Sequence, residues 1–127
     1  MAYSYAGLGQ EIAKYSADEV LCGRLVARAV QVLNTLTDPA QIAEFHAQPV
    51  ATGDSKWDNL IAGVAEYTWS LSGQPGNLAW ADEIAALPDW WEPGNMPKRW
   101  RTWNMVHTPP SLRERRVIYP RQWLQAV

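Results

Sequence analysis

Residues 16–36 read Ser-Ala-Asp-Glu-Val-Leu-Cys-Gly-Arg-Leu-Val-Ala-Arg-Ala-Val-Gln-Val-Leu-Asn-Thr-Leu, and this stretch decides the fold class. Its apolar residues recur every three or four positions, which is the period of a helix with one buried face. Ser16 and Glu19 have the spacing of a capping box, so we predict a helix over residues 17–36, with a polar face that includes Arg24 and Arg28. The apolar stripe consists of Val20, Leu21, Leu25, Val26, Val30, Leu33 and Leu36.

A second long helix is predicted over residues 55–72. Asp54 or Ser55 can cap its start, and Gly73 stands where a glycine commonly ends a helix. Its apolar stripe consists of Trp57, Leu60, Ile61, Val64, Thr68 and Leu71.

Shorter helices are also predicted. Asp38 and Pro39 read as the cap and first residue of a helix that would bury Ile42 and Phe45. Asn77 would cap another helix over residues 78–87. Two helical turns should lie near residues 98–106, and further short helices should start after Thr108-Pro109 and after Pro120.

Beyond Pro88, prolines interrupt every candidate element, so this end should cover the helical body as short pieces. The triplet Val117-Ile118-Tyr119 is either a short strand or part of the cover. The sequence therefore predicts a mainly α fold: a small bundle of two long and several short helices under an irregular Pro/Trp-rich segment with at most one short strand. We expect a single domain over 1–127, with the body at about 1–87 and the cover at about 88–127.

Charge and tryptophan are distributed unevenly along the chain. All eight tryptophans lie at or beyond Trp57. From Lys98 onward there are seven basic residues and one acidic residue, a net charge of +6, which leaves −8 for the rest of a chain whose total is −2. This end is either a recognition surface or a tail docked on its own acidic body.

Composition excludes several classes of protein. The single cysteine, Cys22, cannot form an internal disulfide, which favours a reducing compartment. The first residues lack a basic start followed by an apolar run, and no apolar stretch approaches the ~18 residues of a membrane span. We expect a cytoplasmic protein with no membrane partner. No residue spacing predicts a metal site or a cofactor.

The stretch Pro49-Val-Ala-Thr-Gly-Asp-Ser-Lys-Trp-Asp-Asn-Leu-Ile-Ala-Gly-Val-Ala-Glu-Tyr67 resembles an uncharacterised bacterial module with a Pro-x-x-Thr-Gly-Asp-x-Lys/Arg-Trp-Asp core. The resemblance covers roughly residues 20–126. It continues through Trp80, the pair Trp90-Trp91, and the segment Thr108-Pro-Pro-Ser-Leu-Arg-Glu-Arg-Arg-Val-Ile-Tyr119.

Members of this module often follow a helix-turn-helix DNA-binding domain or are encoded beside a nucleotidyltransferase-like toxin gene. The resemblance therefore implies an antitoxin or regulatory interaction module rather than an enzyme. The part of this chain before the module is too short for a helix-turn-helix domain, which argues against direct reading of DNA sequence.

Two sets of residues could support catalysis. Asp54 and Asp58 could form a metal or acid/base pair, but the pattern favours a structural role in which Asp54 caps the helix, Asp58 lies in its first turn and Trp57 anchors it in the core. Arg101 and His107 have the loose Arg-x5-His spacing of higher-eukaryote-and-prokaryote-nucleotide-binding ribonucleases. Many arginines produce such spacings by chance, so we favour an exposed or hydrogen-bonded His107.

The remaining candidates have simple structural interpretations. His46 is expected to be a surface or capping residue, and Cys22 small core filler.

The basic, tryptophan-rich end is the best candidate for a binding surface. Stacking of bases on Trp100 and Trp103 would suit single-stranded nucleic acid, but the pI near 5.6 is low for such a protein. We favour arginines that pair with Glu66, Asp82, Glu83, Asp89 and Glu92 or with an acidic partner protein. The partner-binding residues would be Arg99, Trp100, Arg101, Trp103, Arg113, Arg115 and Arg116.

Two hypotheses about function follow. The first is a non-enzymatic protein-interaction module, and its specific form is the antitoxin or regulatory subunit of a bacterial toxin–antitoxin-like system. The alternative is an RNA-binding protein or ribonuclease that uses Arg101 and His107.

Overall fold

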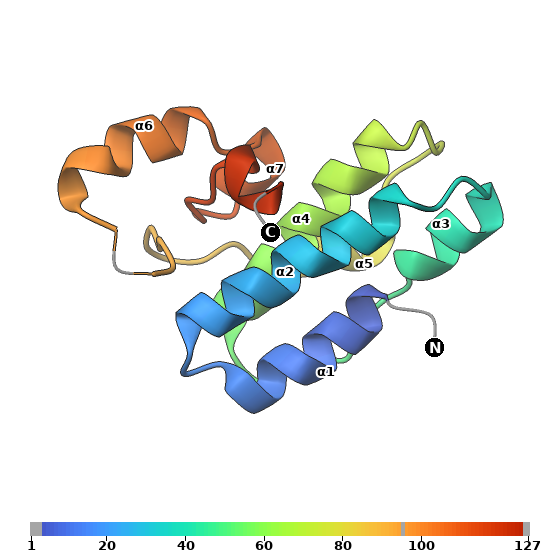
Figure 1. Cartoon of the computed structure of the whole chain (residues 1–127), viewed down its shortest axis with the longest axis horizontal. Coiled ribbons are helices and arrows are strands. Elements are labelled where there is room, and N and C mark those ends of the chain that lie inside the picture. The colour runs from blue at the N-terminus through green and yellow to red at the C-terminus, as the bar shows by residue number, and fades with distance from the viewer. Residues whose placement is uncertain (1–3, 95, 126–127) are drawn as a thin grey trace.

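The chain is a small bundle of helices covered by its own C-terminal segment, as seen in a computed structural model that describes residues 4–94 and 96–125 (Figure 1). The mainly α fold class is confirmed. The longer helices are α1 (Tyr5–Tyr15), α2 (Glu19–Asn34), α3 (Pro39–Phe45) and α4 (Ser55–Leu71). Shorter pieces follow: α5 (Ala79–Asp82), η1 (Lys98–Trp100), α6 (Arg101–Val106), α7 (Pro110–Arg113) and η2 (Arg121–Leu124).

Helix α1 has no counterpart in the sequence prediction. Ser4 caps it by accepting a hydrogen bond from the N–H of Gly7, and Tyr5, Leu8 and Ile12 are fully buried. Because α1 continues to Tyr15, the predicted capping role of Ser16 is wrong. Ser16 ends α1, and Asp18 caps α2 by accepting from the N–H of Leu21 at 3.0 Å.

Helix α4 lies at the centre of the bundle. The capping prediction for Asp54 is confirmed, and the helix is buried on almost every side from Trp57 to Ala65. A helix that is buried all round must have packing partners on all its faces. These partners are α1, α5 and α7. Its last apolar residue, Leu71, is 68% exposed and lies outside the core.

Of the segment after Pro88, residues 108–124 cover the bundle as predicted, whereas residues 96–107 extend away from it (Figure 1). Val117, Ile118 and Tyr119 are at most 3% exposed, so the triplet is part of the cover. Within the described residues, its only β-type pairing is a parallel bridge between Val117 and Trp91, where Ile118 N–H donates to the Trp91 carbonyl at 2.8 Å. The helix predicted over 78–87 is shorter: α5 ends at Asp82, and no side chain caps it.

A chain of buried polar groups joins α1, α3 and α4. His46 Nδ1 lies 2.7 Å from the Ile42 carbonyl, so the ring carries its proton on Nδ1. In this tautomer, Nε2 accepts from the Thr68 hydroxyl at 2.8 Å, and Thr68 in turn accepts from the Tyr5 hydroxyl at 2.8 Å. His46 is 1% exposed. The prediction of a capping position for His46 is confirmed, since it is the C-cap residue of α3. The alternative of a surface position is wrong, because Tyr5 comes from a helix that the sequence did not predict.

The contact between α4 and α7 depends on a glycine. A Cβ added at Gly63 would lie 2.5 Å from Leu112 Cδ2 and 2.9 Å from Leu112 Cγ. Both distances are shorter than the closest approach of two non-bonded carbon atoms. We expect Gly63→Ala to lower the free energy of unfolding by about 1–3 kcal/mol, because overpacking outweighs the better helix propensity of alanine. Urea unfolding followed by circular dichroism would measure this.

Gly7→Ala in α1 is the matched control, because the nearest atom to its added Cβ is at 3.7 Å. It should raise the free energy of unfolding by about 0.5–1 kcal/mol. A Gly63→Ala variant as stable as Gly7→Ala would contradict the close packing of α4 and α7.

Burial should make His46 a source of acid sensitivity. It lowers the pKa of His46 below its ordinary value of 6.5, because the imidazolium would lose its hydration. The unfolded chain then binds more protons than the folded chain below about pH 6.5. The contribution of His46 to stability should be complete above that pH and should decline as the pH falls toward the lowered folded pKa.

Urea unfolding at pH 7.5 and 5.5 would check this, with His46→Gln as the variant that lacks the titrating group. The loss of stability between the two pH values should be smaller in His46→Gln. Should that variant fail to fold, an NMR titration of the His46 ring in the unmodified chain would decide: a midpoint at or above 6.5 would refute the prediction.

Candidate functional site

The Thr52-Gly53-Asp54 loop and the start of α4 form a self-contained cap. Asp54 accepts from the N–H of Lys56 at 2.9 Å, and one oxygen of Asp58 accepts both the N–H and the hydroxyl of Thr52 at 2.8 Å. Gly53 has a φ of 89°, a left-handed conformation that favours glycine. Both carboxylates are therefore engaged in building the loop, and Trp57 beneath them is 1% exposed. The geometry agrees with a structural role and not with an acid/base pair.

Arg115 lies inside the fold and ties three helices together. Its guanidinium donates to Glu66 on α4 at 2.8–2.9 Å, to the Ala81 carbonyl on α5 at 2.6 Å and to the Ile84 carbonyl at 3.1 Å. It also donates to Asn59 at 3.2 Å, and the residue is 7% exposed. A side chain with all these partners is not available to another protein, so Arg115 does not belong to the candidate binding surface.

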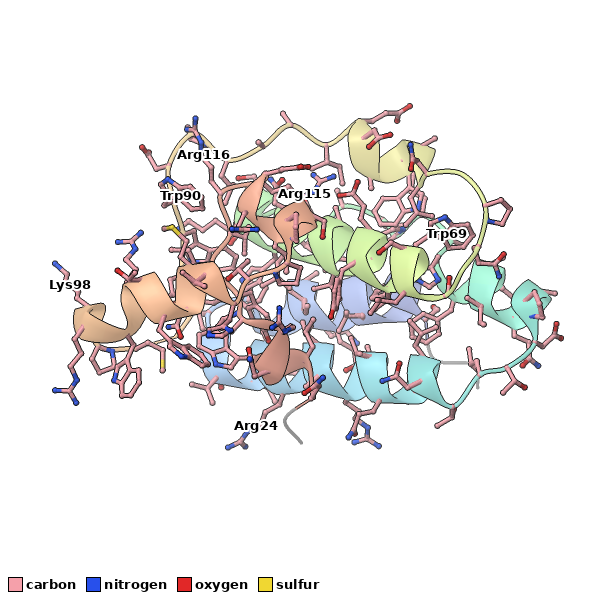
Figure 2. All side chains as sticks on the ribbon, turned by 90° about the horizontal axis from the view of Figure 1, so that it is seen from above. Arg24, Trp69, Trp90, Lys98, Arg115 and Arg116 are labelled. Carbon is pink, nitrogen blue, oxygen red and sulfur yellow. The ribbon has the colours of Figure 1, made fainter. Side chains whose placement is uncertain are left out.

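The neighbouring arginines differ from Arg115. Arg113 and Arg116 are exposed, and Arg116 adopts a φ of 63° and donates to the Pro88 carbonyl. Figure 2 shows Arg116 at one edge of the molecule, while Arg115 points into the fold. Within the described residues, the Arg115–Glu66 pair is the only ion pair. The predicted pairing of the basic end with Glu66 is therefore confirmed, and its pairing with Asp82, Glu83, Asp89 and Glu92 is wrong.

Residues 96–107, which we call the arm, extend away from the helical body (Figure 1). The arm is held by buried Asn104, which donates to Glu92 at 2.7 Å, and by Arg121 N–H, which donates to the His107 carbonyl at 3.0 Å. Its outer surface is apolar at a helical spacing. The exposed fractions are 40% for Met96, 45% for Trp100, 44% for Trp103 and 64% for Val106.

The arm also carries the cations expected of a binding surface. Lys98 and Arg99 are exposed, and Arg101 is half-buried. Lys98 points away from the molecule at its far end (Figure 2). Four of the predicted partner-binding residues thus come together on one short helical segment: Arg99, Trp100, Arg101 and Trp103.

Arg101 and His107 are not brought together as a catalytic pair. Arg101 begins α6, and His107 is the residue that ends it. Six residues of helix separate two side chains by roughly 9 Å along the axis and roughly 120° around it. The His107 ring instead packs on Trp103, with ring centroids 4.0 Å apart.

An apolar groove, which we call the α2 groove, lies between α2 and the C-terminal cover. It has a volume of about 450 Å³ and opens to solvent. The sequence reading missed it, because Val20 was assigned to the buried stripe but is 60% exposed. Its walls come from segments far apart in sequence. They consist of Glu19, Val20, Gly23, Arg24 and Ala27 on one side and Pro93, Gly94, Met96, Tyr119 and Trp123 on the other.

Cys22 is buried and bonded, so its thiol is not a reactive group. Its sulfur donates to the Tyr15 carbonyl at 3.1 Å. Burial, with a smaller effect of Asp18 and Glu19, raises the pKa of the thiol to about 11. A thiol with such a pKa stays protonated and unreactive near neutral pH.

Comparison of the chain with protein-family models, with curated proteins and with solved structures found no match. Among residues 4–94 and 96–125, no helix is long and apolar enough to cross a membrane. The same residues include no group of three or more His, Cys, Asp or Glu side chains placed to hold a metal ion. The arm and the α2 groove are the candidate binding surfaces of this chain.

The buried position of Arg115 predicts a large loss of stability when it is replaced. Arg115→Met should lower the free energy of unfolding by about 2–3 kcal/mol, because it leaves Glu66 without its partner. The cost would be larger if the Glu66 carboxylate were not partly exposed to solvent, which screens its charge. Urea unfolding would measure this loss.

Arg113→Met removes an exposed cation at the end of α7, two residues before Arg115, and should change stability by no more than about 0.5 kcal/mol. Similar effects of the two substitutions would contradict the structural role of Arg115.

Proposed function

We propose that this chain is a non-enzymatic protein-interaction module that binds its partner through the arm. The observation that carries the proposal is the exposed apolar face of the arm, where two tryptophans stand among cations that form no ion pair within the described residues. Exposed tryptophan and arginine side chains are the types most enriched at the energetic centres of protein interfaces. Neither tryptophan belongs to the buried core cluster, so their exposed faces are available to a partner.

The partner is proposed to be acidic where it meets the arm. Lys98, Arg99 and Arg101 would steer such a partner into contact, and a charge pattern of this kind sets association rate and specificity more than affinity. The narrower proposal, an antitoxin or regulatory subunit of a bacterial toxin–antitoxin-like pair, is supported by the resemblance around Thr52-Gly53-Asp54. The partner would then be the product of a neighbouring gene.

A second candidate function is binding of single-stranded RNA. The same two exposed tryptophans favour it, because bases could stack on their rings while the cations contact phosphates. The separation of Arg101 and His107 gives no support to the ribonuclease form of this candidate. The acidic pI of about 5.6 makes it the weaker of the two.

Replacing the arm tryptophans should abolish partner binding without unfolding the chain. We expect the Trp100→Ala/Trp103→Ala double variant to bind the co-expressed product of the adjacent gene at least ~30-fold more weakly, as for interface hot spots worth about 2 kcal/mol or more. Trp90→Ala is the matched control, since Trp90 is 44% exposed but lies outside the arm. Co-purification followed by titration calorimetry would measure the affinities.

If no neighbouring product binds at micromolar concentration or arrests growth when expressed alone, the antitoxin proposal fails. The same variants should be tested on labelled single-stranded RNA at two salt concentrations. Binding whose logarithm falls linearly with the logarithm of salt, and which is lost in the double variant, would favour the second candidate.

A further inference from the structure

The α2 groove lies next to the arm. Met96 belongs to both, since it begins the arm and lines the groove. On α2 the groove extends from Glu19 to Ala27, eight residue steps or roughly 12 Å of helix. Gly23 and Ala27 have small side chains or none, so they leave space along this face of α2. Beside them, Val20 is 60% exposed and Met96 is 40% exposed.

The form of the groove suits a peptide better than a small molecule. Small-molecule pockets enclose most of their ligand and hold it with a few well-placed polar groups. This groove is open, and the Tyr119 hydroxyl within it is directed to the Gly23 carbonyl at 3.4 Å. A groove of this kind can accept the apolar face of an amphipathic helix, whose side chains at positions i, i+3 or i+4, and i+7 would fill it.

The two ends of the groove differ in charge. Arg24 lines it, and Arg28 lies one turn further along the same face of α2; both are exposed and neither forms an ion pair within the described residues. Arg24 points away from the body in Figure 2. At the opposite end, Glu19 accepts from the N–H of Gly94 at 3.2 Å, and Asp18 caps α2.

We infer that the α2 groove binds an amphipathic helical segment of the partner protein, with acidic residues of that segment beside Arg24 and Arg28. This inference rests on the proposed function and adds the chemistry of the partner. Charge complementarity selects the occupant: an acidic segment gains two cations at one end and avoids Glu19 and Asp18 at the other. A basic segment would meet Arg24 and Arg28 as like charges, which costs binding energy.

The probe for the test is a labelled 16-residue helical peptide with leucines at the i, i+3, i+4 and i+7 spacing and glutamates beside them at one end. A control peptide carries lysines in place of the glutamates. Fluorescence anisotropy with the full chain in about 0.15 M salt would measure both affinities. We expect the acidic peptide to bind at least about tenfold more tightly than the basic one.

Variants of α2 locate the binding site. Val20→Asp places a carboxylate in the apolar groove and should weaken binding of the acidic peptide by about tenfold or more. Val50→Asp makes the same change at a residue that is 73% exposed elsewhere, and it should leave binding within about twofold. Arg24→Glu should weaken the acidic peptide and strengthen the basic one.

Equal binding of the two peptides, or an unchanged affinity in Val20→Asp, would overturn the inference. Self-association of the unmodified chain that Val20→Asp abolishes would also overturn it, because the occupant would then be a second copy. If Val20→Asp does not fold, NMR shifts of Gly23 and of the Trp123 indole on adding the acidic peptide decide the matter. Shifts at both support the inference, and unchanged signals refute it.

The two proposals fail in different ways. Partner capture that survives Val20→Asp but is lost in Trp100→Ala/Trp103→Ala would leave the proposed function intact and remove the groove from it. Peptide binding in the groove without any capture of a neighbouring product would support the groove and contradict the antitoxin proposal.

Discussion

The arrangement of the C-terminal half depends on the hydrogen bonds and the ion pair that the Arg115 guanidinium makes. This guanidinium joins the turn after α7 to Glu66 on α4 and to the carbonyl of Ala81 on α5, in a position where only 7% of the residue reaches solvent. A buried cation requires a partner for nearly every donor, so α4, α5 and α7 can meet in few ways. The absence of a side chain at Gly63 then allows Leu112 to lie directly against α4.

This anchoring explains why one basic, tryptophan-rich stretch separates into two parts with different roles. Arg115, Val117 and Tyr119 complete the core, and their burial fixes the cover in place. The arm is attached chiefly through Asn104 and the carbonyl of His107, so its apolar face remains in water. The positive charge at the end of the sequence therefore has two components: Arg115, a buried structural cation, and the exposed cations of the arm, which we propose as a binding surface.

Much of the body could be predicted from the sequence, because helix caps and apolar periodicity are local properties. Asp54 and Asp38 cap the helices they were expected to cap, and the long helices lie close to their predicted ranges. Burial of individual residues was less predictable. His46 looked like a surface residue, and Val20 looked buried, since each depends on which distant segment packs over it. The sequence did not predict α1, whose Tyr5 joins His46 through the Thr68 hydroxyl. The helical spacing of the apolar residues of α1 could have revealed this helix.

The sequence by itself determined a mainly α chain, the capped loop before α4, and a C-terminal end that prolines divide into short covering pieces. These features follow from contacts between residues near one another in the chain. Only the tertiary structure decided which arginine is internal, which tryptophans stay exposed and that an apolar groove lies along α2. The walls of that groove come from α2, from Pro93, Gly94 and Met96, and from Tyr119 and Trp123. No local sequence pattern predicts that these three segments lie side by side, because their arrangement depends on how the whole core packs.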